Sequence, residues 1–281
     1  MKPNKKHNSV VIAIAQAKRE PWEKIYQEGQ LPTWILRFQN EVQIVNFCGL
    51  SMSRFWRMYD DFHERVRASR FYGKFQYQLE LLFVPWLIRN IPKSKELVTN
   101  SISDIQIMTN ASVAFSGRRW IGLINWFLEE DNHEFLFITN SSSLINFRRL
   151  EEIILDLPTD QYVYAGLAHK TPSHQFISGS GILLNRMSAK VVISKFRKFP
   201  HRLLNDVALG TLLQKNGVPM SNIPYMSVKT IDEVFQLSKE DLLSSFQFRC
   251  KTVSEPRRDS EVMRALHNRL ISINDQGNIV Y

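Results

Sequence analysis

Short apolar runs alternate with longer amphipathic segments along most of the chain. The runs have the length of strands and are rich in β-branched residues, whereas the segments between them repeat apolar positions with a helical period. This alternation predicts an α/β fold in which a central, mostly parallel mixed sheet carries helices on both faces. Strands are expected at residues 10–15, 42–47, 105–108, 135–139, 162–164 and 182–184.

Several of the runs are apolar at consecutive positions, which is typical of strands that are covered on both faces. In sheets of this kind, ligands bind beyond the carboxyl ends of the strands, here after Ala15, Phe47 and Thr139. The dipeptide Asn216-Gly217 is a helix stop signal and ends the last expected helix. Helices are expected at residues 20–28, 54–68, 76–88, 120–128, 146–155, 188–197 and 203–215.

The sequence has no internal repeat, no low-complexity linker and no shift in composition that would separate two domains. It therefore predicts a flexible basic tail at residues 1–8 and one domain over residues 9–281. A chain of 281 residues is long for a single domain but suits a large α/β domain. From residue 221 onward the pattern is less regular and more basic.

Charge narrows the classes of partner. The hydrophobic content of 44% argues against disorder, and the net charge of +9 calls for an anionic partner. Nucleic acid, an anionic membrane surface and a phosphorylated substrate satisfy this charge equally well, and a plain solvated surface also explains it. A basic nucleic-acid-binding protein is the second alternative function, motivated by the charge and by scattered aromatic residues. No nucleic acid is expected, because the sequence contains no recognisable nucleic-acid-binding module.

Cysteine usage and hydropathy indicate the compartment. Cys48 and Cys250 are too few for a disulfide framework and have no metal-ligand spacing, which favours the reducing cytoplasm. The apolar stretch LELLFVPWLI at 79–88 contains Pro85 and has about half the length needed to cross a bilayer. We therefore expect a cytoplasmic protein without a transmembrane anchor, with peripheral contact to an anionic inner membrane face as a further option.

Four short segments occur in a distinctive order. REPW at 19–22 follows the first expected strand, and VQIVNFCG at 42–49 contains the second. FLFITNSSSLIN occupies residues 135–146. FISGSGILLN at 176–185 is followed by NDVALG at 205–210. Together the segments cover roughly residues 10–220, about three quarters of the chain.

This ordered set resembles the Fringe and β-1,3-galactosyltransferase family. The corresponding family motifs are R-E-T-W, a second strand that ends in glycine, T-D-D-D-x-F-V-N, Y-x-S-G-x-G-Y-V-L-S and E-D-V-x-x-G. The resemblance implies a GT-A-type glycosyltransferase that moves a hexose or N-acetylhexosamine from a UDP-sugar to a hydroxyl of a glycan or glycolipid, with inversion. The segments FQFRCK at 246–251 and MRALH at 263–267 resemble bacterial members. A cytoplasmic bacterial enzyme of surface polysaccharide or lipopolysaccharide synthesis would fit the basic charge and the expected lack of an anchor.

Asp206 is the candidate catalytic base. Sugar transfer needs a base for the acceptor hydroxyl and cations or hydrogen-bond donors for the departing diphosphate. Asp206 stands near the start of the expected helix 203–215, where the helix dipole favours a carboxylate. The resemblance implies that this residue is the inverting base. The alternative is an ordinary first-turn helix residue.

The sequence Ser178-Gly179-Ser180-Gly181 precedes an apolar strand. Glycine allows a ligand to approach the backbone closely. The resemblance implies that Gly179, Ser180 and Gly181 line the sugar or acceptor pocket, and a plain tight turn is the alternative. His169 and His174 either line the acceptor cleft or lie on surface loops.

The sequence departs from the family at Asn140-Ser141-Ser142, where the family has acidic residues that hold a divalent metal. Neutral oxygens are poor ligands for Mn²⁺ or Mg²⁺, so the sequence predicts no metal site here. Two explanations remain open: a non-catalytic relative that binds a nucleotide-sugar or glycan, or an enzyme that uses cationic side chains instead. Asn140, Ser141 and Ser142 would then hydrogen-bond the ribose or the donor sugar.

Cations for the diphosphate are available near the C-terminus. Arginine suits bidentate phosphate contacts and lysine supplies a point charge. Arg249, Lys251 and His267 are the candidate donor-binding residues of this segment, and Arg19 is a further candidate at the end of the first strand. The pair Arg257-Arg258 is assigned to the solvated surface.

Overall fold

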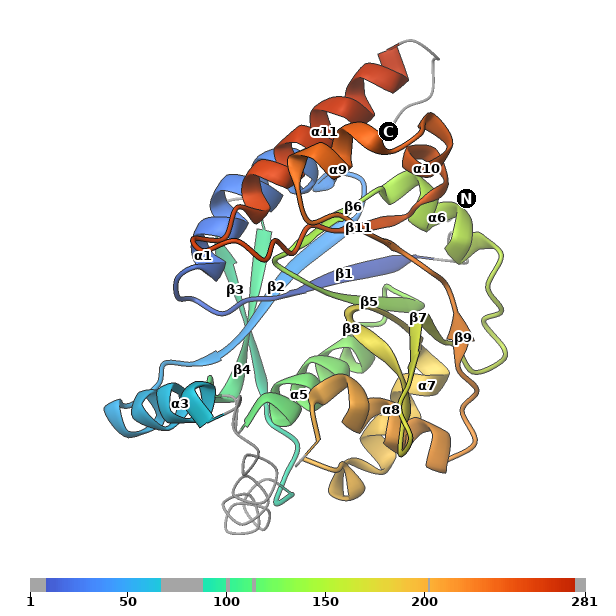
Figure 1. Cartoon of the computed structure of the whole chain (residues 1–281). Helices are drawn as coiled ribbons and strands as arrows, with labels where there is room; N and C mark the ends of the chain where they lie inside the picture. Colours follow the sequence, from blue (N-terminus) through green and yellow to red (C-terminus); the bar gives the residue numbers. More distant parts are fainter. Residues whose placement is uncertain (1–8, 67–87, 100–101, 113–114, 202, 276–281) are drawn as a thin grey trace.

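The computed structural model describes residues 9–66, 88–99, 102–112, 115–201 and 203–275 (Figure 1). The expected tail at 1–8 and nearly all of the expected helix at 76–88 lie outside these residues. Within them, a large sheet forms the centre of the molecule, with helices above and below it in the view of Figure 1. The predicted α/β class is therefore confirmed.

The central sheet has eight strands among the described residues, in the order β3-β4-β2-β1-β5-β8-β7-β9. Strands β4, β2, β1 and β5 are parallel, whereas β3 and β8 run antiparallel to their neighbours. The sheet is thus mixed and mostly parallel, as predicted. The strands are β1 (Val10–Ala15), β2 (Gln43–Leu50), β3 (Ser94–Thr99), β4 (Ile102–Asn110), β5 (Phe135–Asn140), β7 (Tyr164–Lys170), β8 (Gln175–Asn185) and β9 (Ser221–Asn222).

The side chains of β1 explain why its residues are apolar at consecutive positions. Ile12 and Ile14 point into one hydrophobic cluster, and Val11 and Ala13 point into another on the opposite face. All four are fully buried, because successive side chains of a strand alternate between the two faces and helices cover both.

Each face has its own helical layer. One face is covered by α5 (Ser116–Glu129), α7 (Arg186–Ser194) and α8 (Asn205–Lys215). The helices that follow lie on the other face or at its margin: α1 (Trp22–Ile25), the π-helical segment η1 (Tyr26–Ile35), α2 (Leu36–Phe38), α6 (Phe147–Leu155), α9 (Ile231–Gln236), α10 (Lys239–Ser244) and α11 (Asp259–Asp275). In Figure 1, α3 (Arg54–Val66) lies away from both layers, and the short η3 (Phe196–Lys198) follows α7. No described helix has the length and hydropathy to span a membrane.

The region after residue 221 is more regular than its sequence pattern indicated. A small sheet joins β10 (Met226–Ser227), β11 (Gln247–Arg249) and β6 (Ser143–Ile145), and the long helix α11 packs against η1. Val262, Leu266 and Leu270 repeat every four residues and are buried. The basic residues between them masked this helical period in the sequence. Because β11 pairs with β6, which follows β5, the small sheet places the C-terminal region beside the end of β5.

Candidate functional site

Three of the segments singled out in the sequence meet at one edge of the central sheet. Because β1, β2, β4 and β5 are parallel, their carboxyl ends lie at the same edge, and Asn140 ends β5. Strand β8 runs back along β5 with Gly181 opposite Thr139, so Gly179 and Ser180 also lie at this edge. The first turn of α8 brings Asp206 to the same place.

Asp206 is held by backbone donors. Its Oδ2 accepts a 2.9 Å hydrogen bond from the N–H of Gly179, and its Oδ1 accepts one of 2.9 Å from the N–H of Val207. The carboxylate is only partly buried, so it remains accessible at the sheet edge. Burial raises the pKa of the Tyr164 phenol well above its usual value, and the negative charge of Asp206 raises it further. Asp206 is therefore held in one position and is partly exposed.

Arg249 is linked by hydrogen bonds to Ser178, the residue before Gly179 in β8. Ser178, next to Gly179 in β8, shares a 3.0 Å hydrogen bond with the hydroxyl of Tyr225. Nη1 of Arg249 donates to the same hydroxyl at 3.4 Å. Arg249 stands in β11 opposite Ser143, so the small sheet holds its half-buried guanidinium beside the end of β5. A carboxylate and a guanidinium thus lie at one edge of the sheet.

Polar atoms of the Asn140-Ser141-Ser142 turn form hydrogen bonds both within the turn and to other segments, as the Cys250 N–H does with the Ser142 carbonyl. Oδ1 of Asn140 accepts hydrogen bonds from the Ser142 N–H at 3.0 Å and from the Ser143 hydroxyl at 3.4 Å. Ser141 and Ser142 are 3% exposed. Among the described residues, no group of three His, Cys, Asp or Glu side chains could hold a metal ion. The turn does not fit a divalent cation, because it presents hydroxyl and amide groups where such an ion requires carboxylates.

Arg257 extends the site, in contradiction to the expectation that it decorates the solvated surface. Its side chain is 15% exposed and forms an ion pair with Asp259, which is fully buried. Its Nη2 donates to the Ser142 hydroxyl at 3.0 Å, and its guanidinium lies 4.3 Å from the centre of the Trp22 ring. The buried partner Asp259 keeps Arg257 inward. Arg258 follows the expectation, since it is exposed and pairs with Glu261.

Gly181 has a packing role that the sequence did not reveal. It is buried, and a methyl group at its position would overlap the side-chain amide of Gln247, whose Cδ would lie 2.9 Å away. Nε2 of Gln247 donates to the Ser180 carbonyl at 2.6 Å and to the Ser143 hydroxyl at 3.0 Å. The absence of a side chain at Gly181 lets the small sheet approach the large one. Of the predicted pocket residues, Gly179 is the one next to Asp206.

The structure does not gather every predicted residue around Asp206. Lys251 follows β11 and is exposed. His267 lies about halfway along α11, where burial and the charge of Arg37 lower its pKa. Arg19 follows the carboxyl end of β1. Burial lowers the pKa of the Arg119 guanidinium to about 10, and the nearby charge of Arg19 adds to this effect.

Sequence reasoning missed Tyr225, Gln247 and the inward position of Arg257. A signal for one of them existed: Gln247 and Arg249 alternate with the apolar residues Phe246 and Phe248, as expected for two polar side chains on the same face of a strand. The segment around Tyr225 contains no comparable pattern.

The sequence matches no protein-family model, and a search of the curated proteins found no match. The site is therefore assigned from its geometry and chemistry.

Proposed function

We propose that this protein is an inverting glycosyltransferase with a GT-A-type domain. It would transfer a hexose or N-acetylhexosamine from a UDP-sugar to a hydroxyl of a glycan or glycolipid. The observation that carries the proposal is the position of two charged groups beside one short stretch of β8 at the carboxyl edge of the sheet. The Asp206 carboxylate accepts from the N–H of Gly179, and the Arg249 guanidinium is linked through Tyr225 to Ser178. Sheets of this kind bind their ligands at that edge.

Asp206 would act as the general base. Its carboxylate takes the proton from the acceptor hydroxyl while that oxygen forms a bond to the anomeric carbon. The bond from this carbon to the diphosphate oxygen breaks on the opposite face of the sugar, and the nucleoside diphosphate leaves with the electron pair. The backbone hydrogen bonds to Asp206 hold the carboxylate in one orientation, which lowers the entropy lost in the transition state.

Arg249 would supply the positive charge for the departing diphosphate. The charge of Arg257 is already balanced by the buried carboxylate of Asp259, so Arg257 contributes directed N–H groups more than net charge. Among the described residues Arg249 forms no ion pair with a carboxylate, and it donates a hydrogen bond to the neutral hydroxyl of Tyr225. An arginine whose charge is not balanced by a carboxylate suits a bidentate contact to phosphate oxygens.

One feature favours a second function, which is nucleotide-sugar binding without catalysis. The turn at Asn140-Ser141-Ser142 presents no carboxylate, although it ends the strand next to the proposed base. A protein of this kind would bind the donor and leave it intact. Measurement of both donor binding and sugar transfer distinguishes such a binding protein from the enzyme.

The test combines binding and turnover. A series of nucleoside diphosphate sugars is first screened by thermal shift, because a ligand that binds only the folded state raises its melting temperature. Transfer from the best donor is then compared between wild type, Asp206→Asn and the control Asp160→Asn, an exposed acid in a loop. Loss of a general base lowers turnover by about 10²–10⁴-fold.

We expect that loss in Asp206→Asn alone, with donor binding unchanged. Wild-type turnover in Asp206→Asn would refute the assignment of the base. Donor binding without transfer in the wild-type protein would establish the binding function instead. The configuration of the product, measured by NMR, must be inverted relative to the donor.

A further inference from the structure

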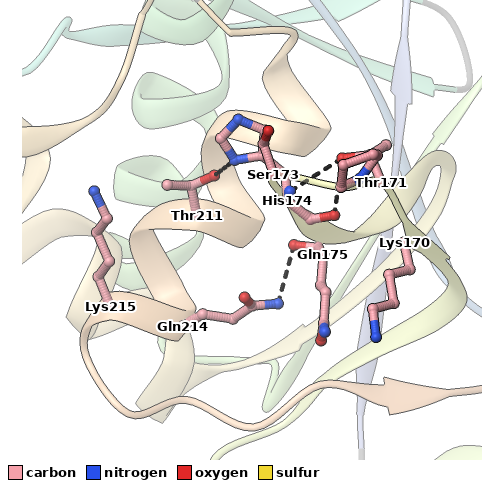
Figure 2. Close-up of a pocket in the computed structure, with 9 residues that line it drawn as sticks. Lys170, Thr171, Ser173, His174, Gln175, Thr211, Gln214 and Lys215 are labelled. Carbon is pink, nitrogen blue, oxygen red and sulfur yellow. Dashed lines mark hydrogen bonds between the residues drawn. The ribbon is translucent and has the colours of Figure 1, made fainter.

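A pocket lies between the β7–β8 turn and the second half of α8 (Figure 2). Its volume of about 460 Å³ lies in the range of small-molecule sites, roughly 300–1,000 Å³. Turn residues Thr171, Ser173 and His174 line one side, and Gln214 and Lys215 of α8 line another. The residues that line this pocket differ from Arg249 and from those of the Asn140 turn.

The lining of this pocket is cationic and contains no acidic residue. Lys170 and Lys215 lie on opposite sides of it in Figure 2, with the two glutamines Gln175 and Gln214 between them. Neither lysine forms an ion pair with a carboxylate of the described residues. The Ser173 hydroxyl and the Gln175 side-chain amide are further polar groups of the lining. This combination of ammonium groups and neutral donors suits an oxyanion, a phosphate or a carboxylate.

The turn is held in shape before any ligand arrives. The Thr171 hydroxyl donates to the His174 carbonyl at 3.1 Å and accepts from the His174 N–H at 3.0 Å. The Thr171 N–H also donates to the His174 carbonyl, at 2.8 Å. Across the pocket, a ring nitrogen of His174 lies 3.1 Å from the Thr211 hydroxyl of α8. Little ordering of the protein is therefore needed on binding, which favours affinity.

Two elements connect this pocket to the proposed base. Helix α8 carries Asp206 in its first turn and Gln214 about two turns later, which is about 12 Å along the helix. Strand β8 carries Gly179 at the base and Gln175 at the pocket. Nε2 of Gln214 donates to the Gln175 carbonyl at 3.0 Å, so the two elements are bonded at the pocket. The pocket and the proposed base are thus placed by the same helix and the same strand, about two helical turns apart.

We propose that this pocket binds an oxyanion of the acceptor, so that the acceptor is an anionic saccharide. The inference rests on the proposed glycosyltransferase function and extends it to the substrate class. The oxyanion belongs either to a phosphate, as in a saccharide on a lipid phosphate, or to a carboxylate, as in an acidic sugar. Lys170 and Lys215 hold the charge, and the part of the acceptor that carries the hydroxyl reaches Asp206 over the protein surface, because α8 is packed tightly against β8 at Gly210 and Phe176.

The first experiment measures binding and needs no catalysis. Glucose 1-phosphate, glucuronic acid and neutral glucose are titrated into the full-length protein by ligand-observed NMR. The variants are Lys170→Gln with Lys215→Gln, Asp206→Asn, and the control Lys195→Gln, an exposed lysine at the end of α7. We expect one or both anions to bind and glucose not to bind. The double lysine variant should weaken this binding by at least about tenfold, and the other two variants should leave it unchanged.

UDP binding provides the matched comparison between the two sites. Arg249→Gln should weaken the binding of UDP and leave the binding of the anionic saccharide unchanged. The double lysine variant should weaken the binding of the anionic saccharide and leave the binding of UDP unchanged. Absence of anion binding, or equal binding to the double lysine variant, overturns the pocket assignment. The difference between the phosphate and carboxylate probes identifies the source of the oxyanion.

The second experiment measures transfer to anionic and neutral forms of the same acceptor. Wild type should favour the anionic form in kcat/KM, and the double lysine variant should lose that preference while its donor binding stays normal. Anion binding to Lys170 and Lys215 without any effect on transfer overturns the acceptor assignment. If wild type transfers no sugar, the proposed function fails and the acceptor assignment fails with it, whereas the oxyanion site is still decided by the titration.

Discussion

The backbone N–H of Gly179 donates a 2.9 Å hydrogen bond to Oδ2 of Asp206. This bond joins β8 to the first turn of α8 and orients the carboxylate toward the sheet edge. The approach is close because Gly179 has no side chain: a Cβ there would lie 3.1 Å from Oδ2 and 3.4 Å from Cγ of Asp206. The two segments that the sequence analysis noted separately are thus one structural unit.

Replacement of Gly179 tests this unit. The added methyl group of Gly179→Ala should move the Asp206 carboxylate by a few tenths of an ångström and lower turnover by about 10–100-fold, because a misplaced catalytic group loses much of its effect. Binding of the donor should change little. Steady-state kinetics and a donor titration measure the two effects.

Gly217→Ala is the matched control. Gly217 has a φ of 77° just after α8, so alanine there destabilises the fold by about 1 kcal/mol without a contact to Asp206. Turnover per folded molecule should stay normal. A fall in turnover that is equal in both variants would mean that the Gly179→Ala effect reflects general destabilisation.

Replacement of Arg249 tests the diphosphate contact. Arg249→Gln should weaken UDP binding by about 1.5–3 kcal/mol, the contribution of a charge-assisted hydrogen bond, and leave uridine binding unchanged. Lys251→Gln should have a smaller effect, because Lys251 is exposed and its charge is screened by solvent and salt. Calorimetric titration of UDP and uridine into each variant gives the comparison.

Arg258→Gln serves as the control for charge, since Arg258 is exposed and pairs with Glu261. It should bind UDP like wild type. If Arg249→Gln loses uridine and UDP affinity equally, the variant has damaged the fold. If it loses neither, Arg249 has no part in donor binding.

The contact between Gly181 and Gln247 predicts a stability effect that a second substitution relieves. Gly181→Ala forces the Gln247 amide away and breaks its hydrogen bonds to Ser180 and Ser143, so it should destabilise the fold by about 1–3 kcal/mol. Denaturant unfolding measures the change. In the double variant Gly181→Ala with Gln247→Ala, the loss should be smaller than the sum of the two single losses. Additive losses would contradict a direct contact.

His201 predicts how stability depends on pH. Burial, with a contribution from the charge of Arg118, lowers its pKa from 6.5 to about 4. Between these two pH values the unfolded chain binds a proton at His201 and the folded chain does not, so the unfolding free energy falls as the pH falls from 6.5 toward 4. The shift corresponds to about 3 kcal/mol in the unfolding free energy.

As the pH falls from 6.5 toward 4, the unfolding free energy of His201→Asn should therefore fall less than that of wild type. The exposed His169 provides the control, and His169→Asn should follow the wild-type curve. The measurement is the unfolding free energy in urea at several pH values. Parallel curves for wild type and His201→Asn would refute the effect.

The sequence by itself determined the class of the fold and the position of the proposed base. Hydrophobic residues at consecutive positions predicted strands covered on both faces, and the structure confirms β1 at Val10–Ala15. The stop signal at Asn216-Gly217 and the polar start of α8 placed Asp206 in a first helical turn. These features follow from local backbone preferences and from the period of the apolar residues, which are properties of neighbouring positions in the chain.

The tertiary structure decided which polar residues meet. Arg257 turns inward because Asp259 is buried beside it, and Arg258 stays outside, although the two arginines are adjacent in sequence. Tyr225 joins the site because β10 lies beside β11, and Gly181 is glycine because Gln247 occupies the space above it. Each of these facts depends on a contact between residues that are distant in the chain or on the burial of a charged partner. No local pattern encodes such contacts, because they exist only once the two sheets have packed together.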